Sequence, residues 1–185
     1  MNARGVEPGD LVLVKSPGVV FAAGRLATGN LYDHVGVVVR RGLTVNIDKP
    51  GARTLPVDRL LRSALRPRLL RPRWGGPAER EGFVDWIEGL VSAPYDTRRT
   101  LQLLPRVLLR RWAGIARPLE RADEHTRRWI CTDAVLVGLE RYAAGFAEIR
   151  ALPLDWVALR CGTTNDFLVI ARERSDLICE VPVPD

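Results

Sequence analysis

Histidine is scarce in this sequence, which contains only His34 and His125. The three cysteines, Cys131, Cys161 and Cys179, are an odd and widely spaced set without a Cys-x-x-Cys pair, so they do not indicate a disulfide framework. No apolar run is long enough to span a bilayer, and the first residues lack the hydrophobic core of a signal peptide. We therefore expect reduced thiols and a cytoplasmic location.

Lysine is almost absent, since Lys15 and Lys49 are the only two, and the net charge of +6 therefore comes from arginine. An arginine-rich and alanine-rich coding bias accounts for such a balance. The alternative is affinity for an anionic surface such as lipid headgroups. The sequence has no zinc-finger spacing and no basic strand interleaved with aromatic residues, so we expect no nucleic-acid partner.

The order of the predicted elements favours an α+β fold. Early strands are predicted at 9–14, 34–39, 43–48 and 52–55, and the second and third of these form a hairpin across Gly42. Helices are predicted in the middle of the chain, at 77–91, 97–115 and 134–142, and closing strands at 166–172 and 177–183. We expect the prolines of residues 65–73 to confine that segment to a sheet edge. The pattern predicts an antiparallel, small barrel-like sheet with helices packed on one side.

Residues 97–115 are both basic and amphipathic, with Pro105 inside the pattern. The apolar stripe that we expect is Leu101, Leu104, Leu108 and Trp112. Arginines fill much of the remaining helix surface. Two interpretations stay open: a helix that packs its stripe on the core, or an interfacial helix at a membrane surface.

Cys131 lies where the predicted helix at 134–142 should begin. A thiol at a helix N-terminus lies near the positive end of the helix dipole and near free backbone N–H groups, which lower its pKa. The same N–H groups can bind an oxyanion. The alternative interpretation is a small buried residue at a helix start.

His34 opens a valine-rich predicted strand, and a cysteine nucleophile needs such an imidazole to accept and return a proton. The imidazole in turn needs a polar partner that holds its tautomer. Asn46 is predicted on the strand that returns from the hairpin, close to His34. Asp48 has the same parity as Asn46 and is the alternative partner.

Four short motifs in this order resemble one enzyme superfamily: GDLVLV at 9–14, YDHVGVV at 32–38, APYD at 93–96 and ICTD at 130–133. Together they resemble the circularly permuted papain-like enzymes of the NlpC-type superfamily, which include YiiX-type amidase-like proteins and the lecithin:retinol acyltransferase group. In that branch an early His opens a strand, a polar residue follows on the next strand, and the nucleophilic Cys comes late at a helix start. The order His34, Asn46, Cys131 is similar.

The resemblance implies one permuted papain-like domain over residues 1–185, with a basic amphipathic helical insertion around 97–128. It implies a catalytic triad of Cys131, His34 and Asn46, and acyl transfer through a thioester that needs no metal or organic cofactor. Relatives often have His or Glu where Asn46 stands, and bacterial relatives have Ser-Glu where this chain has Thr132 and Asp133.

The expected function is that of a cysteine hydrolase or acyltransferase that cleaves an amide or ester bond. Its partner would be a small-molecule, peptide or lipid substrate, and the helix at 97–115 mildly favours a lipid and a place at an anionic membrane surface. The alternative is a non-enzymatic binding module that keeps the fold with a vestigial triad. The substrate and the oligomeric state do not follow from the sequence.

Overall fold

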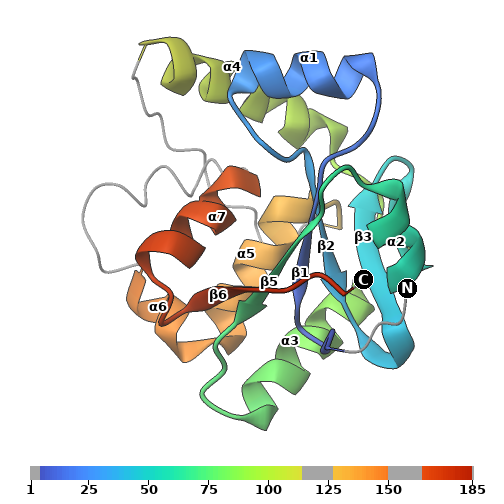
Figure 1. The fold of residues 1–185 in the computed structure, drawn as a ribbon, viewed down its shortest axis with the longest axis vertical. Coiled ribbons are helices and arrows are strands. Elements are labelled where there is room, and N and C mark those ends of the chain that lie inside the picture. Colours follow the sequence, from blue (N-terminus) through green and yellow to red (C-terminus); the bar gives the residue numbers. More distant parts are fainter. Residues whose placement is uncertain (1–4, 114–126, 150–163, 185) are drawn as a thin grey trace.

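The computed structural model describes residues 5–113, 127–149 and 164–184 (Figure 1). Its six strands are β1 (Leu11–Val14), β2 (His34–Val38), β3 (Leu43–Asp48), β4 (Gly51–Pro56), β5 (Arg68–Pro72) and β6 (Ile178–Val181). Its seven helices, among the described residues, are α1 (Val19–Thr28), α2 (Val57–Ser63), α3 (Pro77–Gly89), α4 (Thr97–Ala113), α5 (Cys131–Tyr142), α6 (Ala144–Ile149) and α7 (Thr164–Glu173).

The strands form one antiparallel sheet in the order β4-β3-β2-β1-β5-β6, which confirms the α+β class. The strands β4 and β6 end this order and do not pair with each other, so the described sheet is open and the expected barrel-like closure is wrong. The predicted hairpin is confirmed. β2 and β3 run antiparallel with Gly36 opposite Asn46, which brings the start of β2 close to the middle of β3.

Both faces of the sheet are covered, so the expectation that helices pack on one side only is wrong. Alternate residues of β1 show the arrangement, since Leu11 and Leu13 pack with α3, α5 and α7, while Val12 and Val14 pack with α2. Side chains alternate across a strand, and a strand covered on both faces is apolar at every position. This explains the uninterrupted apolar run LVLV.

Two expectations about late or proline-rich segments are also wrong. β5 lies inside the sheet between β1 and β6, because Pro72 is the last residue of the strand and interrupts no ladder in its middle. Residues 166–172 belong to α7 rather than to a strand. The short apolar run there has no periodicity that separates a buried strand from a buried helix, whereas the closing strand β6 is confirmed.

α4 confirms the predicted helix over residues 97–113, with Pro105 inside it. Its buried residue is Leu103, whereas Leu101, Leu104 and Trp112 of the predicted stripe are exposed. The rest of the predicted insertion includes residues 114–126, which lie outside the described residues. In the part of the chain that the structure describes, every helix is too short or too polar to cross a membrane.

Candidate active site

The His34 ring, at the start of β2, contacts the Asn46 side chain on β3. The distance from His34 Nε2 to Asn46 Oδ1 is 3.1 Å. An amide oxygen only accepts hydrogen bonds, so Nε2 carries the proton and donates it to Asn46. Nδ1 is then the ring nitrogen left to accept a proton from another group.

Thr44 determines which way the Asn46 amide points. Thr44 Oγ1 donates to the backbone oxygen of Leu55 at 3.0 Å, and Asn46 Nδ2 donates to Thr44 Oγ1 at 2.9 Å. The Thr44 proton is used on Leu55, so its oxygen can only accept from Asn46. The amide nitrogen therefore faces Thr44 and the amide oxygen faces His34. Sequence reasoning missed Thr44, and the only available signal was its parity with Asn46.

Gly36 makes room for this contact, as its place opposite Asn46 suggests. A Cβ at position 36 would lie 2.8 Å from Asn46 Oδ1, the atom that accepts from His34, and 2.9 Å from Leu60 Cδ2. Both distances are shorter than normal contacts, so a side chain at position 36 would displace the Asn46 oxygen. The absence of a side chain at Gly36 therefore serves the orientation of His34.

Cys131 is the first residue of α5, as predicted, and it is partly buried. Its thiol lies close enough to the His34 ring and to the backbone N–H groups of Val35 and Thr132 for these groups to lower its pKa. Val35 directly follows His34, and α5 packs against β2. His34 and Asn46 are therefore in hydrogen-bonding contact, and Cys131 and His34 are close enough for each to shift the pKa of the other.

The thiol and the imidazole influence each other's pKa in opposite directions. Burial acts to raise the pKa of Cys131, but the His34 charge, the hydrogen bond to its ring and the backbone N–H groups outweigh burial and lower that pKa. Burial acts to lower the pKa of His34, but the Cys131 charge and hydrogen bonds to Cys131 and Asn46 outweigh it and raise that pKa. Both directions favour a thiolate beside an imidazolium.

Asp48, the alternative partner, acts on His34 through charge. His34 donates to Asn46, whereas Asp48 Oδ2 accepts from Arg53 at 3.0 Å and Asp48 Oδ1 is buried with no hydrogen-bond partner among the described residues. The Asp48 charge nevertheless contributes to raising the pKa of His34. Of the two alternatives, Asn46 has the geometry that orients the ring.

The Asp133 carboxylate, which replaces the Glu expected in bacterial relatives, binds α4 to α5. Arg99 Nε lies 2.6 Å from Asp133 Oδ2, and both side chains are nearly buried. Burial raises the pKa of Asp133 more than Arg99 lowers it. This pair therefore places α4 beside the helix that begins with Cys131.

Tyr95 lies near the site and has no counterpart in the predicted triad. Burial raises the pKa of Tyr95, and the charges of Cys131 and Asp48 add to this increase. Its hydroxyl is 2.9 Å from Thr100 Oγ1 in α4. The APYD motif signalled this position without indicating a role.

The other cysteines and the second histidine do not join this group within the described residues. Cys179 lies on β6, where its sulfur is 3.7 Å from the backbone oxygen of Arg71. Cys161 and His125 lie outside the described residues.

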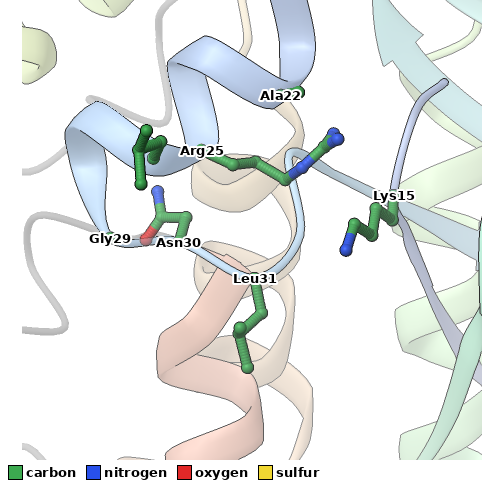
Figure 2. A pocket seen from close by; sticks show the side chains of 7 residues that line it. Lys15, Ala22, Arg25, Gly29, Asn30 and Leu31 are labelled. Atoms are coloured by element: carbon green, nitrogen blue, oxygen red, sulfur yellow. The ribbon is translucent and has the colours of Figure 1, made fainter. Parts of the chain in front are cut away.

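An open pocket of about 380 Å³ lies between α1 and the ends of β1 and β2, near the start of β2. Figure 2 shows Arg25 reaching from α1 across this space toward the segment that carries Lys15. Arg25 Nη1 donates to the Ser16 backbone oxygen at 2.9 Å and pairs with Asp33, the residue before His34. The pocket therefore adjoins the strand end where the His34 ring is held.

No family model matches this chain, and no curated protein matches its sequence. Among solved structures, the chain is similar to the crystal structure described as metalloprotein yiiX from Escherichia coli O157:H7. The TM-score is 0.50 and the identity is 16%, over 75% of this chain and 67% of that one. The chain thus shares the fold of YiiX, and the resemblance predicted from the sequence is confirmed at the level of the fold.

Proposed function

We propose that this protein is a thiol-dependent hydrolase or acyltransferase that cleaves an amide or ester bond, with Cys131 as nucleophile, His34 as proton carrier and Asn46 as the residue that orients His34. The observation that supports the proposal is the position of the His34 ring, which donates to Asn46 Oδ1 and lies close enough to Cys131 for the two groups to shift each other's pKa. Covalent acyl transfer requires a nucleophile, a base and a group that orients the base, all close to one another.

The proposed reaction begins with the Cys131 thiolate attacking the carbonyl carbon of the substrate. Backbone N–H groups in the first turn of α5 stabilise the oxyanion, since they lie at the positive end of the helix. The His34 imidazolium then protonates the leaving amine or alcohol as the carbon–heteroatom bond breaks, which leaves a thioester on Cys131. Neutral His34 next takes a proton from water or another acceptor, which attacks the thioester and releases the acyl group and the thiolate.

The YiiX structure is described as that of a metalloprotein. In the described ranges of this chain, no group of three or more His, Cys, Asp or Glu side chains is arranged to hold a metal ion. The residues around Cys131 therefore do not fit a metal centre, and the proposed reaction has no step through a metal.

Alkylation by iodoacetamide tests the activated thiol. We expect Cys131 to be labelled faster than Cys161 and Cys179 at neutral pH, because its pKa is lowered and the thiolate is the reactive form. The rate should fall only as the pH drops through this lowered pKa. In His34→Gln, the burial that raises the pKa of Cys131 remains, while the His34 charge that lowers this pKa is lost. The curve of alkylation rate against pH should therefore move to higher pH. Mass spectrometry of the three cysteine peptides measures each rate, and equal rates at all three would contradict the proposal.

A screen of amide and ester substrates tests the reaction itself. Cys131→Ala should abolish turnover, whereas Cys179→Ser, a matched substitution of a thiol away from the site, should retain it. Acyl-enzyme trapped on Cys131 and detected as a mass increase would distinguish covalent catalysis from binding. If Cys131→Ala and the unmodified protein behave alike in every assay, the protein is a binding module with the same fold.

A further inference from the structure

We propose that α1 and α4 together form a docking surface for an anionic lipid bilayer. The α1–α4 surface consists of the exposed apolar side chains of the two helices: Val19, Val20, Phe21, Leu26, Leu101, Leu104, Leu109 and Trp112. The two helices contact each other at one end of the molecule (Figure 1). The indole N–H of Trp112 also donates to the Ala27 backbone oxygen at 3.2 Å.

α1 exposes its apolar side chains and buries its one charged side chain. Its sequence, VVFAAGRLAT, is almost entirely apolar, yet its one buried residue is Arg25. Val20 is 82% exposed and Leu26 is 79% exposed. A helix that is apolar all round is normally buried, and a contiguous exposed apolar patch indicates an interaction site.

α4 turns its predicted apolar stripe outward. Beside its contact with α1, α4 is held by Leu103, Arg99 and Thr100, through the small cluster with Ile130, the pair with Asp133 and the contact with Tyr95. Leu101 and Trp112 are 66% and 73% exposed. The exposed residues of the stripe therefore do not pack on the core. Packing on the core was the first of the two interpretations of this helix.

The charges of these helices favour an anionic partner. α1 and α4 contain Arg25 and five further arginines (Arg98, Arg99, Arg106, Arg110 and Arg111) and no acidic residue. Arg25 and Arg99 pair with Asp33 and Asp133, Arg98 is exposed, and Arg106 is half-buried with a buried Nη1. Exposed apolar residues combined with arginines are the pattern of interfacial helices that bind anionic bilayers.

The same charges disfavour a second copy of this chain as the occupant. A two-fold contact would bring the α1–α4 surface against itself and would place arginine-rich helices opposite each other. An anionic bilayer has both the apolar interior and the negative surface that this combination needs. Because α1 connects β1 to β2, docking would place the bilayer at the end of the sheet where His34 begins β2.

Flotation with lipid vesicles tests the proposal on the full chain. We expect the protein to float with vesicles of phosphatidylcholine and phosphatidylglycerol at low salt, and to be released from them at high salt. Vesicles of phosphatidylcholine alone should bind much less. Absence of flotation with anionic vesicles at low salt would overturn the proposal, as would equal binding to both kinds of vesicle.

Matched variants assign the binding to these helices. Val20→Asn combined with Leu101→Asn should lower the partition coefficient by at least about tenfold, since each apolar side chain contributes through its buried carbons. Val169→Asn, at an exposed position on α7, should bind like the unmodified protein. Arg98→Gln should weaken binding about fivefold, whereas Arg59→Gln, at an exposed position on α2, should not. Circular dichroism confirms that each variant is folded.

Two further results separate this proposal from others. Cys131→Ala should float normally, so loss of enzymatic activity and loss of docking are independent outcomes. If Val20→Asn with Leu101→Asn floats as well as the unmodified protein, the α1–α4 surface is not the docking site. A dimer that this double variant dissociates, without vesicle binding by the unmodified protein, would identify a second copy as the occupant and overturn the proposal.

Discussion

The hydrogen bonds around Asn46 form a directional chain from a backbone oxygen to the imidazole. Leu55 accepts from Thr44, Thr44 accepts from Asn46, and Asn46 accepts from His34. Each group in this chain has its donor or acceptor role assigned by the group before it. These hydrogen bonds therefore favour the tautomer of His34 with its proton on Nε2, which leaves Nδ1 available for the thiol.

Replacing Thr44 with valine tests this chain without changing the shape of the side chain. Thr44→Val leaves Asn46 Nδ2 and the Leu55 oxygen without this partner, which should cost about 1–3 kcal/mol in the free energy of unfolding. With the amide released, we expect kcat to fall while KM changes little, and the Cys131 alkylation curve to shift to higher pH. Thr44→Ser should restore both. An unchanged kcat in Thr44→Val would show that the amide needs no help from Thr44.

Gly36→Ala tests whether the contact between His34 and Asn46 needs an open position on β2. The new Cβ would lie 2.8 Å from Asn46 Oδ1 and must displace it. Because small misplacements of catalytic groups are costly, we expect the rate to fall on the order of tenfold or more. The control is Gly24→Ala in α1, where no atom lies within 4 Å of the added Cβ. It should stabilise the protein by about 0.5–1 kcal/mol, and equal activity in both variants would contradict the role of Gly36.

At the scale of residues, sequence reasoning found the groups that differ chemically from their surroundings. Cys131 and His34 stood out because a thiol at a helix start and an imidazole at a strand start are unusual, and parity brought in Asn46. Thr44 and Tyr95 could not be found in this way. Their positions depend on the register between β3 and β4 and on how α4 returns to the sheet, which residue types and spacing do not encode.

At the scale of elements, α1 is held by its single buried side chain. Arg25 reaches back to Ser16 and Asp33, the residues that precede α1 and begin the return to β2. These contacts replace the apolar packing that normally holds a helix on a core. The helix begins after Gly18, which has a φ of 110°.

Arg25→Met should loosen α1 selectively. Arg25 and Asp33 side chains are only 9% and 16% exposed, so removing one partner leaves a nearly buried charge and should cost about 3 kcal/mol. We expect faster amide hydrogen exchange in residues 19–28, while the amides of β1 stay protected. Arg68→Met breaks the exposed pair with Glu180 and should cost below about 1 kcal/mol. Unchanged exchange in α1 of Arg25→Met would show that the helix is held by other contacts.

Elements with strong periodicity or clear ends were predictable, and short apolar runs were not. α3 begins at Pro77 as predicted, because Gly75 and Gly76 interrupt the chain before it. α7 was predicted as a strand, because an apolar run of its length fits either structure. β5 was predicted at an edge because of its prolines, yet Pro72 stands at the end of the strand, where it removes no central hydrogen bond.

At the scale of the whole molecule, one sheet connects two cores. The larger core contains Leu11 and Leu13 with residues of α3, α5 and α7, and the smaller contains Val12 and Val14 with residues of α2. Because adjacent residues of β1 point into different cores, neither core can lose its packing without disturbing the strand that serves the other. Sequence reasoning missed the second core, since it expected helices on one side of the sheet only.

Leu60→Ala in α2 tests whether the two cores unfold together. Leu60 is buried in the smaller core, and its truncation should lower the free energy of unfolding by about 2–5 kcal/mol. Circular dichroism follows the secondary structure, whereas tryptophan fluorescence includes Trp86 and Trp129, which pack in the larger core. If the cores are coupled, both signals move together to the same lower midpoint in denaturant. Leu65→Ala, at an exposed position, should change stability by less than about 0.5 kcal/mol. A circular dichroism transition that separates from the fluorescence transition in Leu60→Ala would show that α2 and its core unfold as an independent unit.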